Sequence, residues 1–202
     1  MKIAITGNIG SGKSTFTKFA EDAKYPVLRA DVISKEILSA DKEVRELIIK
    51  EFGKQSFKDG KPDVRYLATE VFSDPVKLAI IESILHPRVI KSIEKTSTEL
   101  LKINNVVFVE AALIYEADME DMFDHVVLIT AERNLRLSRK ISSGITEDDF
   151  CKRESNQIPE DEKKKCADFI FSNNGSIEDL KSKFNLLLLT LGIKIVSSIT
   201  TT

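Results

Sequence analysis

The sequence predicts an α/β fold in which helices cover both faces of a parallel sheet. Residues 2–6, 106–110 and 125–130 are short apolar runs, the last two rich in β-branched side chains, which is typical of strands buried in a parallel sheet. Residues 13–23, which come after the first run, are expected to form a helix, because their apolar residues recur at helical spacing. Strands that alternate with helices form parallel sheets, and the ligands of such sheets bind beyond the carboxyl ends of the strands.

The N-terminal half continues with a second strand and a mostly helical stretch. Residues 26–30 are expected to form a strand that ends just before Asp31. Residues 32–103 are expected to be mostly helical, with interruptions at glycines and prolines. Pro87 suits the first position of a helix, where its missing N–H costs nothing.

The C-terminal half is expected to hold two basic helices and a charged connection. Residues 132–141 are helical and basic, and Thr146 with Asp149 forms a capping box for the next helix. Gly144 separates these two helices. Residues 159–165, PEDEKKK, are expected to be a solvent-exposed connection, because runs of charge are usually solvated.

One strand and one helix complete the predicted core. Residues 168–171 are the last strand candidate, and Ser176 with Asp179 caps the final helix. This helix ends at Gly192, and the last six residues, SSITTT, are expected to fray. Its apolar stripe, which we assign to the core, consists of Leu180, Phe184, Leu187, Leu188 and Leu191.

The composition is that of an ordinary globular protein. The 202 residues carry a formal net charge of −2, so no overall attraction to nucleic acid or to a membrane is expected. Cys151 and Cys166 lack metal-site spacing and are predicted to be reduced thiols. The longest apolar run, LLLL at 186–189, is too short to span a bilayer, and no signal peptide is apparent. We therefore expect a cytoplasmic protein that is a monomer or a weak homo-oligomer.

The clearest motif is GNIGSGKS at residues 7–14, directly after the first strand. It fits the phosphate-binding loop (P-loop) in its strand–loop–helix context. Glycines let the backbone N–H groups turn toward phosphate oxygens, and the following helix directs its positive dipole end at the same anion. Lys13 is expected to reach the β- and γ-phosphates, Ser14 to ligate Mg²⁺ and Thr15 to contact phosphate. The nucleotide-binding residues predicted here are Gly7, Asn8, Gly10, Ser11, Gly12, Lys13, Ser14 and Thr15.

A P-loop alone does not separate a kinase from a GTPase, a motor or a transporter subunit. The NKxD and DxxG motifs of GTPases are absent from the sequence. Motors and transporter subunits are usually larger and carry paired carboxylates at a strand end, whereas Glu110 stands alone. These differences favour a kinase of a small molecule. A nucleotide-dependent switch that binds a partner protein is the alternative from another class.

Phosphoryl transfer also needs a carboxylate and cations around the transferring group. Asp31 is placed to orient or deprotonate the acceptor hydroxyl, although it could instead cap a helix. Glu110 could hold Mg²⁺ through water or could merely end a strand. The basic cluster consists of Arg136, Arg139, Lys140, Lys152 and Arg153. Arg139 is the member we expect to bind phosphate, because a guanidinium fork suits it.

These observations predict a P-loop parallel-sheet kinase core with a helical acceptor-binding insert and a small helical lid. The core is expected at 1–31, 104–131 and 161–202. The insert is expected at 32–103 and the lid at 132–160. Such a lid would close over the triphosphate and exclude water.

In order along nearly the whole chain, the motifs resemble those of the dephospho-coenzyme A kinase family. The resembling segments are ITGNIGSGKST, RADVISKEI, FGKQSFKDGKPDVRYLATEVFSDP, LHPRVI, VEAALIYEADMEDMFDHVVLIT, RLSRK, KRESNQ and ADFIFSNNGSIEDL. The resemblance implies transfer of the γ-phosphate of ATP, with Mg²⁺, to the ribose 3′-hydroxyl of dephospho-coenzyme A, the last step of coenzyme A synthesis. A kinase of another hydroxyl acceptor, such as a nucleoside, a nucleotide or a shikimate-like metabolite, remains the competing interpretation.

The resemblance also implies roles for individual residues. Asp31 becomes the base or the acceptor-orienting group, and Lys13 and Arg139 become stabilisers of the transferring group. Asn173 would lie near the adenine, with Gly175 shaping its loop. The residues implied to bind the acceptor are Asp31, Arg65, His86, Arg88 and Glu116. From the sequence alone, His86 before a proline indicates a helix start or a packing position.

The chain departs from the family pattern at several positions. The family often has Asp-Ala-Asp where this chain has Arg29-Ala30-Asp31. Glu110 replaces the usual aspartate, and Ala112 stands where proline is usual. These departures leave the P-loop, Asp31 and Arg139 in place. They put in doubt any role that the family's first aspartate, replaced here by Arg29, would have.

Overall fold

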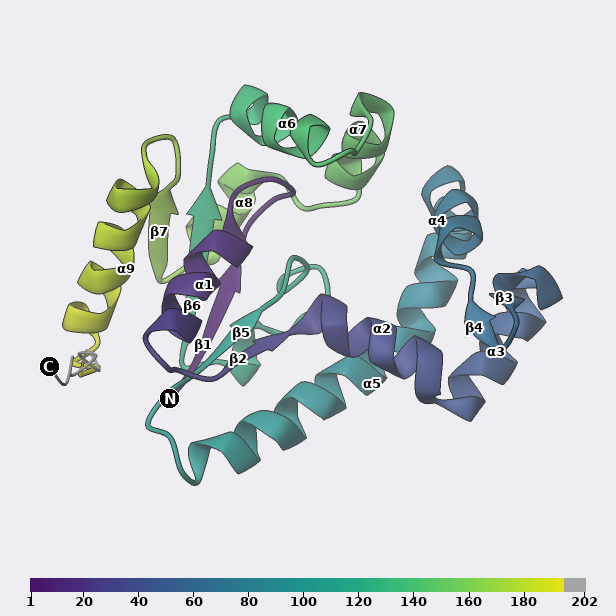
Figure 1. Cartoon of the computed structure of the whole chain (residues 1–202), viewed down its shortest axis with the longest axis horizontal. Coiled ribbons are helices and arrows are strands. Elements are labelled where there is room, and N and C mark those ends of the chain that lie inside the picture. The colour runs from purple at the N-terminus through teal and green to yellow at the C-terminus, as the bar shows by residue number, and fades with distance from the viewer. Residues whose placement is uncertain (195–202) are drawn as a thin grey trace, which may run out of the picture. The chain divides into compact units, whose positions relative to one another are not determined.

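The structure, a computed structural model, describes residues 1–194 (Figure 1). The expected fraying of SSITTT lies outside these residues. Two compact units make up the chain: Met1–Arg29 together with the chain from Thr96 onward, and Ala30–Lys95. We call them the sheet unit and the helical unit and describe each by itself.

The sheet unit is built on five parallel strands in the order β2-β5-β1-β6-β7 (Figure 1). Their bounds are β1 Lys2–Thr6, β2 Val27–Arg29, β5 Val107–Glu110, β6 His125–Thr130 and β7 Phe169–Ser172. β1 is the central strand, and Ala4 pairs with Val109 on one side and with Val126 on the other. The glycine loop therefore leaves the sheet at its middle, where strands on both sides end close by.

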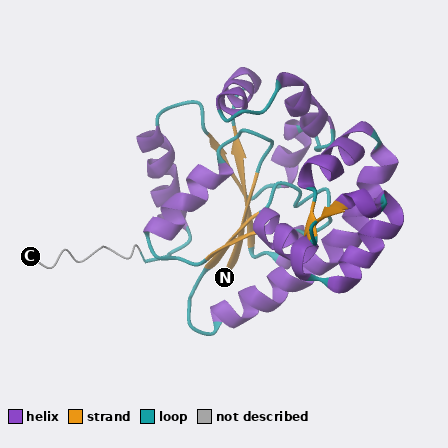
Figure 2. Ribbon diagram, turned by 45° about the vertical axis from the view of Figure 1, so that its right-hand side comes forward, coloured by secondary structure: helices purple, strands orange, loops and turns teal. Residues whose placement is uncertain are grey.

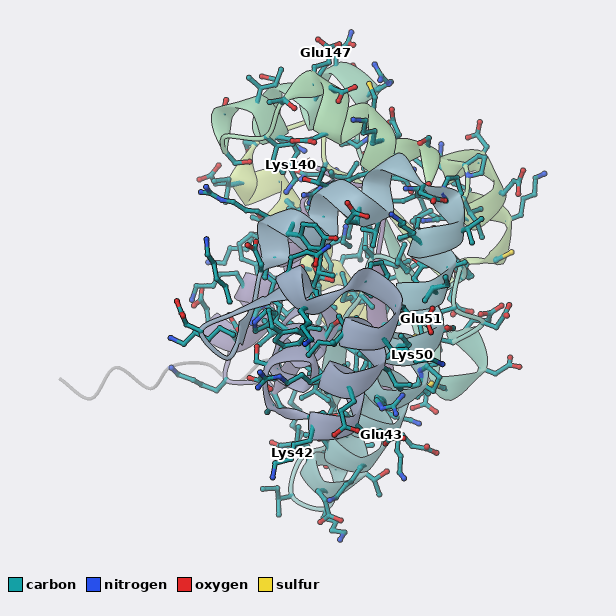
Figure 3. The ribbon with its side chains drawn as sticks, turned by 90° about the vertical axis from the view of Figure 1, so that its right-hand side faces the viewer. Lys42, Glu43, Lys50, Glu51, Lys140 and Glu147 are labelled. Atoms are coloured by element: carbon teal, nitrogen blue, oxygen red, sulfur yellow. The ribbon has the colours of Figure 1, made fainter. Side chains whose placement is uncertain are left out.

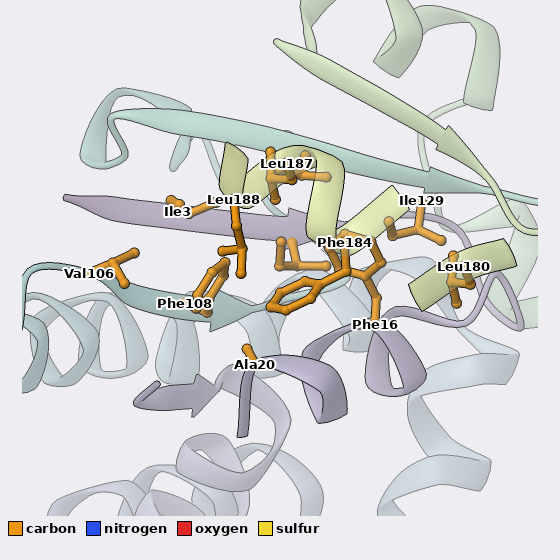
Figure 4. Packing of buried hydrophobic residues seen from close by; sticks show 12 residues of the cluster. Ile3, Phe16, Ala20, Val106, Phe108, Ile129, Leu180, Phe184, Leu187 and Leu188 are labelled. Atoms are coloured by element: carbon orange, nitrogen blue, oxygen red, sulfur yellow. The ribbon is translucent and has the colours of Figure 1, made fainter. Parts of the chain in front are cut away.

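Two helices cover one face of the sheet, α1 (Lys13–Asp22) and α9 (Ile177–Thr190). Phe184 of α9 lies at the centre of this core, with its ring centroid 5.4 Å from that of Phe16 and 5.9 Å from that of Phe108 (Figure 4). Burying a phenylalanine side chain contributes about 1.5–3 kcal/mol. The predicted stripe of α9 is confirmed as core, because Leu180, Phe184, Leu187 and Leu188 are buried and Leu191 packs against them.

The opposite face of the sheet is covered as well. Ala4, Val107 and Leu128 point to that side and are fully buried, and α8 (Glu160–Cys166) packs against β6. The predicted α/β fold with a parallel sheet is confirmed. Among residues 1–194, no helix is both long and apolar enough to cross a membrane.

The prediction that residues 159–165 form an exposed connection is wrong, because most of them belong to α8. The acidic side chains of PEDEKKK occupy the first turn of this helix and the lysines occupy its last turn, which complements the helix dipole. Lys163 is fully buried, and its Nζ lies 2.7 Å from Glu116 Oε1. The charges therefore stabilise a helix, and one of them anchors it to the core.

Two helices follow β6 in the sheet unit. They are α6 (Arg133–Ser142) and α7 (Glu147–Ser155), and Gly144 between them has a φ of +89°. The predicted cap of α7 is present, because the Thr146 hydroxyl accepts a hydrogen bond from the Asp149 N–H. A short 3-10 helix, η2 (Glu120–Met122), precedes β6.

The helical unit has its own apolar core. Its elements are α2 (Ala30–Ala40), α3 (Lys42–Phe52), the 3-10 helix η1 (Lys54–Ser56), the hairpin of β3 (Phe57–Lys58) and β4 (Lys61–Pro62), α4 (Val64–Ser73) and residues 75–95 of α5 (Pro75–Leu101) (Figure 2). α3 buries Val44, Ile48 and Phe52. Its charged residues, among them Glu43 and Lys50, are exposed (Figure 3). This division of faces explains why the segment folds as an amphipathic helix.

Pro87 does not begin a helix, contrary to the prediction, because it lies inside α5. An interior proline removes one backbone hydrogen bond and costs about 3 kcal/mol. Ile84, Leu85 and Val89 flank it and are buried, and each such side chain contributes about 1.5–3 kcal/mol. Packing on both sides of the proline therefore outweighs its local cost.

Candidate active site

The glycine loop has the backbone conformation of an anion-binding loop. Gly10 and Gly12 have φ values of +79° and +102°, and α1 begins immediately afterwards, at Lys13. A Cβ on Gly10 would lie 2.5 Å from the Arg136 carbonyl oxygen, and one on Gly12 would lie 2.1 Å from Asn173 Nδ2. These positions therefore require glycine both for their conformation and for the close approach of neighbouring segments.

Lys13 is folded back over the loop. Its Nζ donates hydrogen bonds to the carbonyl oxygens of Gly7, at 2.7 Å, and of Asn8, at 3.4 Å. The ammonium group thus lies beside the first residues of the glycine loop. A cation and the positive end of a helix dipole are concentrated at the mouth of the loop, which favours a polyphosphate there.

A cavity of about 450 Å³ opens over the loop. Its lining residues are Gly10, Gly12, Lys13, Ser14, Thr15, Arg139, Lys140, Ser143, Asn173, Gly175, Ile177 and Leu180. Most of the residues predicted to bind the nucleotide therefore meet around one cavity. The other three, Gly7, Asn8 and Ser11, are buried.

Lys140, Ser143, Ile177 and Leu180 line the cavity but were not assigned to the nucleotide from the sequence. Lys140 belongs to the predicted basic cluster, of which only Arg139 was expected to bind phosphate. Ile177 is 63% exposed at the first position of α9, next to the loop of Asn173 and Gly175. An apolar side chain in that place is the one signal that could have identified it as a wall of the cavity.

Arg139 connects α6 to the loop. Its Nη2 donates to the Asn173 carbonyl oxygen at 2.7 Å, and its Nη1 lies 3.4 Å from the Gly10 carbonyl oxygen. The Asn173 side chain is itself buried and donates to the Ser11 carbonyl oxygen at 2.8 Å. The loop after β7 is therefore tied to the glycine loop, and Arg139 contacts both.

Glu110 lies beside Ser14 at the end of β5. Ser14 Oγ donates to Glu110 Oε1 at 2.6 Å, and Thr17 Oγ1 donates to Glu110 Oε2 at 2.7 Å. A hydroxyl and a carboxylate are hard oxygen donors of the kind that suits Mg²⁺, so the residues present fit this ion. The described residues contain no cluster of three or more His, Cys, Asp or Glu side chains that could hold a metal, and Mg²⁺ here would need phosphate and water as further ligands. Thr17, which lies one turn after Ser14 on α1, was not among the predicted site residues.

Arg29 connects two carboxylates at the end of β2. Its Nε lies 3.2 Å from Glu110 Oε2, and its Nη1 lies 2.5 Å from Glu21 Oε1. The hydrogen bond with Glu21 raises the pKa of Arg29 and lowers the pKa of Glu21. Arg29 stands where the family often has an aspartate, and in this chain it supplies a positive charge beside Glu110.

Glu116 is engaged by the protein itself. Its Oε1 accepts a hydrogen bond from the Ile158 N–H at 2.9 Å and lies 2.7 Å from Lys163 Nζ. Its side chain is 12% exposed. The structure therefore gives Glu116 a structural partner in α8.

The other residues assigned to the acceptor belong to the helical unit. Asp31 is exposed and is the second residue of α2, which begins at Ala30, so Asp31 does not occupy the N-cap position. Arg65 is exposed in the first turn of α4, and His86 is half-buried in α5. Arg88 pairs with Glu43, with 3.1 Å between Nη2 and Oε2.

The fold and the loop together define a class of protein, the P-loop nucleotide-binding proteins. A shikimate kinase from Acinetobacter baumannii has the same fold, with a TM-score of 0.54 at 16% identity over 96% of this chain and 95% of that one.

The family follows from closer matches. Residues 1–179 match the family model described as dephospho-CoA kinase. A dephospho-CoA kinase of Thermus thermophilus is 35% identical over 94% of this chain and 91% of its own length. The structure of a dephospho-CoA kinase from Campylobacter jejuni has a TM-score of 0.70 at 28% identity, over 95% of this chain and 98% of that one. The chain belongs to the dephospho-CoA kinase family.

Proposed function

We propose that this chain transfers the γ-phosphoryl group of ATP to the ribose 3′-hydroxyl of dephospho-CoA, giving CoA and ADP. Family membership supports the reaction and the acceptor. The observation that carries the proposal is the cavity over the glycine loop, where Lys13, Arg139 and Ser14 meet. This arrangement has the cations and the backbone amides that a triphosphate needs.

In the proposed reaction the glycine loop and Lys13 bind the β- and γ-phosphates. Lys13 would exchange its contacts with the Gly7 and Asn8 carbonyl oxygens for phosphate oxygens. Arg139, which already reaches the glycine loop, would hold the γ-phosphate from the α6 side. The charge that develops on the transferring group would thus be stabilised by donors fixed before the reaction begins.

Ser14 and Glu110 are the residues that would hold Mg²⁺, directly in the case of Ser14 and through water in the case of Glu110. When bound, Mg²⁺ neutralises charge on the phosphates. Thr17 keeps Glu110 oriented through a 2.7 Å hydrogen bond.

Asp31 is proposed to orient the acceptor hydroxyl and to accept its proton as the new O–P bond forms and the bond to the leaving ADP oxygen breaks. It is exposed and lies two residues after Arg29, whose side chain contacts Glu110. A carboxylate within hydrogen-bond reach of a hydroxyl typically contributes a factor of about 10²–10⁴ to the rate.

The domain roles are also part of the proposal. Residues 32–103 would bind the acceptor through Arg65, His86 and Arg88, and the compact helical unit of residues 30–95 supports this assignment. Residues 132–160 would act as the lid. Glu116 would act near the acceptor only indirectly, because its Oε1 is already engaged by Ile158 and Lys163.

We also propose that the enzyme is cytoplasmic and that it acts as a monomer or a weak homo-oligomer. Support for the compartment comes from Cys151 and Cys166, which are free thiols, as is usual in reducing compartments.

The test is an acceptor panel. ATP consumption is measured with Mg²⁺ in the presence of dephospho-CoA, nucleosides, nucleotides or shikimate, and without any acceptor. Turnover that depends on dephospho-CoA supports the proposal. Turnover with another acceptor would leave a P-loop kinase of different specificity, and rapid turnover without an acceptor would favour the nucleotide-dependent switch.

A further inference from the structure

The backbone of Ile9, in the middle of the glycine loop, is held on both sides of its Cα by residues outside the loop. Its N–H donates to Gln157 Oε1 at 2.8 Å, and its carbonyl oxygen accepts from Arg136 Nη1 at 3.2 Å. Ile9 is 148 residues from Gln157 and 127 from Arg136 in the sequence. The loop conformation therefore depends on contacts that the GxxxxGKS motif does not contain.

Gln157 is itself firmly anchored. It follows Asn156, the C-cap of α7, and its Nε2 lies 3.5 Å from the Ala112 carbonyl oxygen. The next residue, Ile158, donates its N–H to Glu116, and Glu116 is fixed by the fully buried Lys163. A continuous chain of contacts thus joins α8 to the glycine loop through Gln157.

Arg136 holds the next peptide of the loop, through the Ile9 carbonyl oxygen. It is 6% exposed, and its Nε donates to the Ala131 carbonyl oxygen at 3.1 Å. Its Nη2 lies 2.7 Å from Glu154 Oε1, and its guanidinium lies over the Phe150 ring. The first part of α6 is therefore fixed to the core and to α7, so the α6–α7 pair supports the glycine loop as well as covering it.

Gln157 is absent from the described lining of the cavity, so its effect on a ligand would pass through Ile9. An anion-binding loop works when its peptides point their N–H groups in a fixed pattern, and a group held in place beforehand loses less freedom on binding. Because the Ile9 N–H points to Gln157, the neighbouring peptides are constrained as well.

We infer that Gln157 is a positioning residue of the nucleotide site, which sets nucleotide affinity by fixing the Ile9 peptide. The inference rests on the proposed function in one respect, that the loop binds an adenine nucleotide. It does not depend on which acceptor is phosphorylated.

The experiment compares ADP binding by the full chain and by Gln157→Met, measured by calorimetry. Methionine keeps an unbranched side chain of similar size but replaces the amide oxygen by a thioether, which is only a weak acceptor for the Ile9 N–H. Loss of the partner of this half-buried donor is expected to weaken ADP binding about tenfold. The KM for ATP should rise by a similar factor, whereas the KM for dephospho-CoA should stay within about twofold. Asn156→Ala, at the neighbouring exposed position, is the matched control and should bind ADP as the natural chain does.

A second readout separates positioning from a general loss of stability. Hydrogen exchange of the Ile9 amide, followed by NMR, should accelerate in Gln157→Met at a temperature where the variant is folded. If that variant does not fold, Gln157→Asn takes its place, because it keeps the amide but is one methylene too short to reach Ile9.

Unchanged ADP affinity in a folded Gln157 variant would overturn the inference, whatever its melting temperature. Absence of ADP binding by the natural chain would instead contradict the proposed function. The two failures are therefore distinguishable.

Discussion

Ser14 Oγ donates a 2.6 Å hydrogen bond to Glu110 Oε1, and this bond joins the first turn of α1 to the end of β5 across 96 residues of sequence. The contact places a hydroxyl and a carboxylate side by side at the mouth of the glycine loop. It is the arrangement expected of a Mg²⁺ site that relies on nucleotide phosphates for its remaining ligands.

Replacing Glu110 by glutamine should impair the use of Mg²⁺. The neutral amide keeps the size of the side chain but removes the negative charge beside Ser14. We expect the Mg²⁺ concentration for half-maximal rate to rise about tenfold, as is typical when a group that orients metal ligands is lost. Kinetics at varied Mg²⁺ and fixed ATP measure this, with the exposed Glu162→Gln as the control. An unchanged Mg²⁺ dependence would mean that Glu110 only ends a strand.

The pair of Arg29 and Glu21 should stabilise the fold in a pH-dependent way. Both side chains are about one-third exposed, so solvent weakens their interaction, and a double-mutant cycle of Arg29→Gln and Glu21→Gln should give about 1 kcal/mol. Because Arg29 lowers the pKa of Glu21 in the folded state, this contribution is fully present above the unfolded pKa of about 4.5. It is lost as the pH falls through the lower folded value.

Urea denaturation of the four proteins of this cycle at neutral and at acidic pH tests the prediction. The coupling free energy should shrink at acidic pH. A coupling that is the same at both pH values would contradict the assignment of the pKa shift to this pair.

Breaking the buried pair of Lys163 and Glu116 should be costly. Lys163 is fully buried, and removal of one partner of a buried ion pair costs about 3–5 kcal/mol. Lys163→Met should therefore lower the free energy of unfolding by that amount in urea denaturation. Adding Glu116→Gln should restore part of the loss, because the remaining side chain is then neutral. If the two changes proved additive, the pair would not be coupled in the way the geometry indicates.

Asp31→Asn should separate catalysis from nucleotide binding. The asparagine side chain cannot take a proton from the acceptor, so kcat should fall by about 10²–10⁴. Affinity for ADP should change little. Asp59→Asn is the matched control, because Asp59 is exposed in the β3–β4 turn with a φ of +50°, which asparagine tolerates. A loss of ADP affinity as large as the loss of rate would refute this division of roles.

Local signals were sufficient for much of the fold and for the glycine loop. The loop motif, the caps at Thr146 and Ser176 and the apolar stripe of α9 each depend on residues within a few positions of one another. Short-range patterns of this kind can be found in the sequence without knowledge of the rest of the fold.

Other features could not be predicted because they depend on residues far apart in the sequence. The contacts of Thr17 with Glu110 and of Gln157 with Ile9 span 93 and 148 residues. The burial of Lys163 is invisible in a run of charges until its partner Glu116 is known. Pro87 lies inside α5 because packing on both sides outweighs its local preference.

The central claim is phosphoryl transfer to dephospho-CoA, and product analysis tests it most directly. The purified chain is incubated with ATP, Mg²⁺ and dephospho-CoA, and the acceptor is analysed by mass spectrometry and ³¹P NMR. We predict a product heavier by one phosphoryl group, carried on the ribose 3′-oxygen, with little ATP consumed when the acceptor is left out. Recovery of unmodified dephospho-CoA while ATP is consumed would contradict the account.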